Sequence, residues 1–331
     1  MTLIKKPSEL NNEPKLKGLI YGEPGLGKTS LALSSPSPLL IDFDNGLRRV
    51  DKQYQTDSVQ IESYQNLLDI LEKEDLSPYK TIVIDTLGKM IDRISDWLAS
   101  SNPKVKQADG QLSMKGWGSV KLEFQRLLKL LDSKNKSVIF VAHNKEEKDG
   151  ENTKQRPDIA GSSGKDIVKE LDFMGFMSMK GGKRTIDLMP NEQYYAKNSL
   201  GLNSFLEYPK LSGKNDFLSK AIFEAYKIKI EKDNELSEQF NTLIQIIDER
   251  ISVLETIIEV NDYYKNSYQK LEKIWESDLY EKNKFNEKIK ALNFEFDKTK
   301  KIFIDKNPPK QDEVKEKPQE TKKETQEVVS E

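Results

Sequence analysis

The sequence predicts an α/β protein with a mostly parallel central sheet, followed by an α-helical region. Short apolar runs at 17–21, 38–43, 81–84 and 137–142 alternate with helical patterns, as buried parallel strands do. Glycine or a polar residue follows each run, which marks the strand ends. From 216 to 306 proline and glycine almost vanish, and apolar residues recur every three or four positions. That spacing favours long amphipathic helices.

The composition narrows the classes of protein and site to consider. The chain has 331 residues, enough for one large domain or two, and its net charge of -2 gives no overall attraction to nucleic acid. The absence of cysteine excludes disulfides and thiolate chemistry, and a single histidine, His143, argues against a histidine-based metal site. No run reaches the about 20 apolar residues of a membrane span, so we expect no membrane contact.

Changes in composition divide the chain into four parts. We expect a flexible polar arm over 1–14, an α/β domain over 15–210 and a helical region over 211–306. The Lys- and Glu-rich segment 307–331 has the composition of a disordered tail. The apolar stripes of 211–306 predict a helical hairpin or a coiled coil. They would pack on one another or on the α/β domain, or they would mediate self-association.

A phosphate-binding pattern follows the first apolar run. The stretch is Gly22-Glu23-Pro24-Gly25-Leu26-Gly27-Lys28-Thr29-Ser30, which fits G-x-x-x-x-G-K-[ST] at every fixed position. Its glycines allow the backbone to bend around an anion with its N–H groups pointing inward. This P-loop predicts a nucleoside triphosphate site, in which Lys28 reaches the β- and γ-phosphates and Thr29 is a ligand of Mg²⁺.

Acidic residues at two strand ends supply the other predicted site groups. Asp85 ends the apolar run 81–84, where a carboxylate holds Mg²⁺ opposite Thr29. In many P-loop ATPases the carboxylate that activates water directly follows this acid, but here Thr86 does. Asp44 is therefore the best candidate for the catalytic carboxylate, and the alternative is that it caps the next segment.

His143 ends the fourth apolar run, where its side chain could contact the γ-phosphate and pass its state to the residues beyond; the alternative is a structural histidine. We expect 144–164 to form a long mobile loop, because it is charged and contains glycine and proline. Its basic residues, together with Trp117, could bind single-stranded DNA, although acids dilute them. Trp117 could instead pack on the helix that follows it.

Taken together, these residues resemble the RecA-like ATPase core, and most closely phage-encoded nucleotide-binding proteins of the Sak type, which are single-strand annealing and recombination ATPases. The resemblance covers about 15–205. It implies ATP hydrolysis with Mg²⁺, binding of single-stranded DNA, a homo-oligomer, and the cytoplasm of a bacterial host cell. It also implies a recombination or replication protein as partner of the C-terminal helices.

The resemblance also assigns roles to individual residues. Asp44 falls at the position of the catalytic glutamate of RecA. The segment 195–201 is similar to a Lys-x-Arg-x-Gly segment whose basic residues reach the γ-phosphate of a neighbouring subunit. Lys197 is kept there as the candidate trans-acting finger, but Ser199 replaces the arginine, and Arg184 or Lys183 could substitute for it.

Two other functions fit parts of the sequence. The protein could be a nucleotide-gated switch or assembly protein that acts through its C-terminal helices without DNA, which would suit slow turnover. A metabolic P-loop kinase is disfavoured, because such enzymes need several arginines over the acceptor phosphate and arginine is scarce here.

Overall fold

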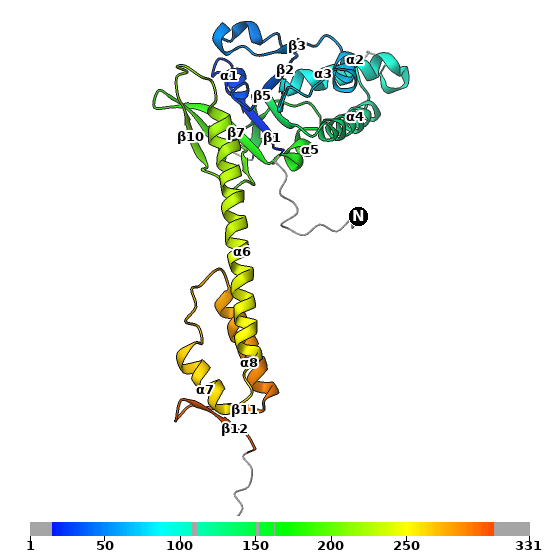
Figure 1. The fold of residues 1–331 in the computed structure, drawn as a ribbon. Helices are drawn as coiled ribbons and strands as arrows, with labels where there is room; N and C mark the ends of the chain where they lie inside the picture. The colour runs from blue at the N-terminus through cyan, green and yellow to red at the C-terminus, as the bar shows by residue number, and fades with distance from the viewer. Residues whose placement is uncertain (1–14, 108–110, 150–151, 162, 308–331) are drawn as a thin grey trace, which may run out of the picture. The chain divides into compact units, whose positions relative to one another are not determined.

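The computed structural model describes residues 15–107, 111–149, 152–161 and 163–307 (Figure 1). The chain divides into two compact units, Met1–Lys232 and Asp233–Glu331. The predicted arm, 1–14, and the predicted tail from residue 308 onward lie outside the described residues. Within the described ranges, every helix is too short or too polar to cross a lipid bilayer.

The first unit is built on a mostly parallel sheet with the strand order β10-β8-β7-β1-β5-β4-β2-β3. From β7 to β3 all neighbours in this order are parallel, and β8 and β10 add an antiparallel edge. β6 pairs with β5, and β9 with β7. The strands are β1 Lys17–Gly22, β2 Pro38–Asp42, β3 Ser58–Gln60, β4 Thr81–Asp85, β5 Ser137–Asp149, β6 Asn152–Pro157, β7 Phe173–Lys180, β8 Lys183–Asp187, β9 Lys197–Asn198 and β10 Phe205–Tyr208. The predicted α/β fold is confirmed.

Helices cover both faces of this sheet, because successive strand side chains point to opposite faces. Leu19 and Tyr21 pack with helices α2 to α5, whereas Ile20 packs with α1 and the segment before α6. The helices are α1 Lys28–Ala32, α2 Tyr64–Lys73, α3 Leu87–Ser101, α4 Met114–Ser133, α5 Ser163–Glu170, the 3₁₀ turns η2 Leu47–Arg49, η3 Lys52–Tyr54 and η4 Pro103–Val105, and the π-helical turn η5 Ser219–Glu224.

The expected loop over 144–164 is wrong for most of its length, and the structure has a β-hairpin there. β5 continues past the sheet to Asp149 and pairs with β6, with Asn144 opposite Pro157. Charged residues face one another across the two strands, and Arg156 lies 3.6 Å from Glu147. A two-stranded ribbon has no buried face to create an apolar alternation, so the sequence pattern did not reveal it. β7 and β8 form a second antiparallel hairpin, with Lys180 opposite Lys183.

The second unit contains the predicted C-terminal helices and a strand pair that we did not predict. α6 Ala225–Ser252 begins in the first unit, and α7 Ile257–Asn266 and α8 Ser277–Ala291 follow. β11 Phe294–Asp297 and β12 Ile302–Asp305 form an antiparallel hairpin, so the expectation of helix up to residue 306 is wrong. Aromatic and β-branched residues favour these strands. Phe285 and Phe303 lie in the core shared by the helices and the hairpin.

A pair of glycine substitutions tests the packing of β1 on β7. At Gly18 an added Cβ would overlap the ring of Phe173, whereas at Gly118 in α4 it would meet nothing within 4 Å beyond its own helix. We expect Gly18→Ala to destabilise the protein by about 1–3 kcal/mol through overpacking. Gly118→Ala should stabilise it by about 0.5–1 kcal/mol through helix propensity. Thermal unfolding of the full chain measures both, and an unchanged Tm for Gly18→Ala would contradict the close contact.

Candidate active site

The P-loop joins β1 to α1 and forms a cradle of backbone. Gly25 and Gly27 have φ values of 81° and 89°, in the left-handed region that favours glycine. Gly27 is also the N-cap of α1, and Lys28 begins the helix. The local glycine pattern therefore produces the conformation that the sequence predicted, with no side chain at either position to fill the place of a phosphate.

Lys28 is held over this loop as a buried cation. Lys28 is 6% exposed as a residue, and its Nζ donates a hydrogen bond of 2.7 Å to the carbonyl oxygen of Glu23. Burial lowers the pKa of Lys28 to about 8, against the opposing charges of Asp85 and Glu23. The protein's own acids therefore balance the positive charge of Lys28 only in part, and a bound polyphosphate would supply the rest of the negative charge.

Thr29 and Asp85 meet at the end of β4, and their role as Mg²⁺ ligands stays a prediction. The Thr29 hydroxyl donates to Oδ2 of Asp85 at 2.6 Å. Asp85 is 3% exposed, and burial raises the pKa of its carboxyl to about 6. A Cβ added at Gly46 would lie 3.8 Å from both oxygens, so this glycine leaves room beside them.

The oxygen pair fits Mg²⁺, which prefers hard oxygen ligands and keeps several waters or phosphate oxygens. Among the described residues, no group of three or more His, Cys, Asp or Glu side chains could hold a metal ion. Thr29 and Asp85 would therefore hold the ion together with the phosphates of a nucleotide rather than in a closed protein site. That arrangement is typical of P-loop nucleotide sites.

The two acids after β2 differ in their surroundings. The carboxylate of Asp42 accepts hydrogen bonds of 3.0 Å from the backbone N–H groups of Asp44, Gly46 and Leu47, and so fixes the loop beside Asp85. Sequence reasoning missed this role, although an acid two residues before a turn is a known signal for it. Oδ2 of Asp44 lies 2.8 Å from Nη2 of Arg49, and its catalytic role stays a prediction.

His143 and Lys197 occupy different surroundings. His143 lies opposite Gly22 in the pairing of β1 with β5, and its Nδ1 is buried without a hydrogen-bond partner among the described residues. Burial and the charge of Lys28 lower the pKa of His143. Nζ of Lys197 donates to the carbonyl oxygens of Val168 and Lys169 at 3.0 and 3.3 Å. The sensor and finger roles of these residues stay predictions.

Arg184 lies beside the P-loop of its own chain. Its Nη1 would be 3.0 Å from a Cβ added at Gly27, and its guanidinium lies over the ring of Tyr208, 4.6 Å from the centroid. Nη2 donates to the carbonyl oxygen of Pro209 at 2.7 Å. Sequence reasoning considered this arginine only as a substitute for Ser199, because no local pattern connects β8 with the P-loop.

Asp85→Asn should stabilise the nucleotide-free protein at pH 7.5 while it abolishes Mg²⁺-dependent nucleotide binding. Because the pKa of Asp85 is raised, the folded state binds the proton more tightly than the unfolded state does. Folding stability is therefore lost as the pH rises from about 4 to about 6. Asparagine does not ionise, so above pH 6 we expect the free energy of unfolding of Asp85→Asn to exceed that of the wild type by about 1–3 kcal/mol. Tm measured from pH 4 to pH 8 for both proteins tests the difference.

Asp187→Asn is the matched control for that experiment. Asp187 is also buried, at 7% exposed, but it lies 3.0 Å from Nζ of Lys180. Its replacement leaves the lysine without its partner, so we expect Tm to fall. A fall in Tm for Asp85→Asn at pH 7.5 as well would show that the carboxylate of Asp85 is stabilised by its surroundings.

Comparison with known proteins agrees with this geometry. No curated protein matches the chain. Residues 14–200 match the family model described as an AAA domain. The match covers more than half of the chain and includes the P-loop, Asp85 and His143. The chain therefore belongs to this AAA domain family of nucleotide-binding P-loop ATPases.

Proposed function

We propose that this protein hydrolyses ATP with Mg²⁺ and uses the nucleotide state to control its hold on single-stranded DNA, in recombination or annealing of the kind that Sak-type phage proteins carry out. The observation that carries the proposal is the contact between Thr29 and Asp85 beside the P-loop, on a sheet whose β5 continues into a charged hairpin. Membership of the family supports ATP hydrolysis, and the binding of single-stranded DNA is our inference.

The chain's own residues divide the work of hydrolysis. A bound Mg²⁺ supplies neutralising charge at the β- and γ-phosphates. Lys28 binds the same phosphates, and Thr29 and Asp85 hold the ion in place. Asp44 orients or deprotonates the attacking water. Because aspartate is shorter than the glutamate of RecA-like enzymes, slow turnover follows from this assignment.

Two connections link the phosphate site to the β5–β6 hairpin. β5 passes His143 beside the end of β1 and continues into the hairpin without a break. Tyr21, one residue before the P-loop, is fully buried, and its hydroxyl donates to the carbonyl oxygen of Tyr195 at 2.6 Å. The backbone N–H of Tyr195 in turn donates to the carbonyl oxygen of Gln155 in β6. A shift of the P-loop would therefore reach both strands.

One face of the hairpin has the chemistry of a single-strand binder. Lys145 lies opposite Arg156, and two positions further along Lys154 lies opposite Glu147. Nζ of Lys154 is 4.4 Å from the ring centroid of Tyr195, which is 38% exposed. Basic side chains beside an exposed aromatic ring bind phosphates and stack on bases. Trp117, by contrast, lies inside α4 and packs against the core, which supports its packing alternative.

The ATP turnover rate, titrated with a single-stranded oligonucleotide, tests this proposal. We expect DNA to raise the rate to a plateau and Lys28→Ala to remove both basal and stimulated turnover. Lys154→Glu should leave the basal rate unchanged and raise the DNA concentration for half-activation about tenfold, because it replaces a phosphate-binding cation with an anion. Lys129→Glu, on the exposed face of α4, is the matched control and should not change the activation.

If DNA does not change the turnover rate and Lys28→Ala abolishes it, the proposed control of DNA binding is wrong, whereas the assignment as an ATPase stands. Unchanged turnover in Lys28→Ala would overturn the site assignment itself.

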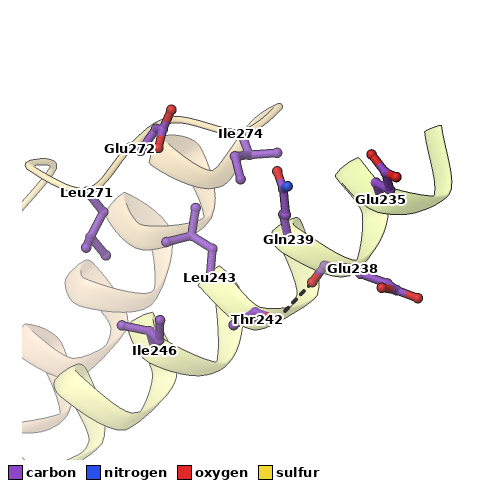
Figure 2. Close-up of a pocket in the computed structure, with 9 residues that line it drawn as sticks. All are labelled: Glu235, Glu238, Gln239, Thr242, Leu243, Ile246, Leu271, Glu272 and Ile274. Atoms are coloured by element: carbon purple, nitrogen blue, oxygen red, sulfur yellow. Dashed lines mark hydrogen bonds between the residues drawn. The ribbon is translucent and has the colours of Figure 1, made fainter. Parts of the chain in front are cut away.

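A second candidate function rests on a groove in the second unit. The groove has a volume of about 520 Å³ and lies between α6 and the segment 271–274 (Figure 2). Leu243 on α6 points toward Leu271 and Ile274 across it (Figure 2). Glu235, Glu238 and Glu272 line the same groove.

Charge complementarity indicates what this groove would bind. None of the three glutamates forms an ion pair with another described residue, and all three line the groove beside its apolar side chains. A basic amphipathic segment of a partner protein fits both features, with apolar residues on the floor and Lys or Arg at the rim. This function is the nucleotide-gated switch that acts through the C-terminal helices.

A synthetic amphipathic helix of leucine and lysine is the probe for that groove. We expect it to bind the full-length protein and the double variant Glu238→Lys, Glu272→Lys to weaken binding about tenfold, because two attractive pairs become repulsive. Glu287→Lys, an exposed position on α8, is the charge control. Fluorescence anisotropy measures the affinities. Equal affinity for all three proteins would contradict a specific site, and a lack of binding to the wild type would remove the groove as a docking surface.

A further inference from the structure

Arg184 is held in one position by its neighbours on β8 and β10. One face of its guanidinium lies on the ring of Tyr208, and Nη2 is bound to Pro209. Tyr208 is 1% exposed and packs edge-on against Phe217, with ring centroids 5.2 Å apart. Burial raises the pKa of Tyr208 to about 12, so the ring under the guanidinium is the neutral phenol near pH 7. Such a guanidinium is ordered before a ligand arrives.

The remaining donor edge of Arg184 faces the P-loop. Nη1 has no hydrogen-bond partner among the described residues, and it would lie 3.0 Å from a Cβ at Gly27. Any side chain at Gly27 would therefore crowd the guanidinium as well as strain the backbone. The glycine keeps this cation next to the loop that precedes Lys28.

The strand order places Arg184 on the side of the P-loop away from Asp85. β5 and β4 follow β1 in one direction, and β4 ends in Asp85. β7 and β8 follow β1 in the other direction, and β8 contains Arg184. A nucleotide whose terminal phosphates lie at Thr29 and Asp85 would extend its α-phosphate and nucleoside toward Arg184.

We infer that Arg184 binds the α-phosphate of the nucleotide from within the same subunit, and this inference rests on the proposed ATPase function. A guanidinium edge with a free N–H is a charge-assisted donor for a phosphate oxygen. Arg184 thus differs from an arginine finger, which comes from a neighbouring subunit and contacts the γ-phosphate. The contact is made equally with ATP and ADP, so Arg184 holds the nucleotide without distinguishing the two.

Binding of ATP and ADP to Arg184→Gln tests the inference. We expect both dissociation constants to rise by the same factor, about tenfold, while kcat at saturating ATP stays unchanged. Arg184→Lys, which keeps the charge and loses the stacked guanidinium, should show an intermediate loss. Lys183→Gln is the neighbouring control, because Lys183 is exposed and pairs with Glu207 at 3.0 Å.

A loss for ATP alone, or a fall in kcat, would overturn the inference in favour of a γ-phosphate contact. Unchanged affinities would overturn it outright. If the Tm of Arg184→Gln falls by several degrees, the comparison rests on Arg184→Lys, whose equal affinity with the wild type would also overturn the guanidinium contact. Failure of the wild-type protein to bind any nucleotide would instead remove the proposed function.

Discussion

The hydrogen bond between Thr29 and Asp85 depends on the register of three strands. β5 lies between β1 and β4, with Gly22 opposite His143 on one side and Asp85 opposite Val141 on the other. A slip of one residue would turn the carboxylate to the opposite face of the sheet. The apolar side chains that fix this register, buried on both faces, therefore also fix the distance between the P-loop and the acid.

The same burial leaves two charged groups incompletely compensated. The pKa of Lys28 is lowered and that of Asp85 is raised, so each is shifted toward its neutral form by burial. A polyphosphate with a divalent cation supplies the missing opposite charges, the anion to Lys28 and the cation to Asp85. The folded protein thus retains electrostatic free energy that ligand binding releases, in keeping with the trade between stability and activity at functional sites.

Local patterns made the P-loop, Asp85 and the main parallel strands predictable. Each is a short run of sequence whose residue types directly determine its conformation. Contacts made by tertiary structure were not predictable in the same way. Arg184 on β8 reaches Gly27 past β7, the strand between β8 and β1, and the carboxylate of Asp42 orders a loop through backbone groups. The β5–β6 and β11–β12 hairpins were missed because charged ribbons and short aromatic strands lack the period that marks buried elements.

The helix that follows the P-loop is bound at its middle and just beyond its C-terminal end by residues 215–219, which connects the nucleotide site to the start of α6. The hydroxyl of Ser34, just after α1, accepts a hydrogen bond of 2.9 Å from the backbone N–H of Leu218. Asn215 donates to the carbonyl oxygen of Ser30 at 2.8 Å, and Ser219 begins a π-helical turn. Such turns are rare and often occur at functional positions. Movement of α1 on binding phosphate would therefore act on the backbone of 215–219 directly, and α6 continues from there.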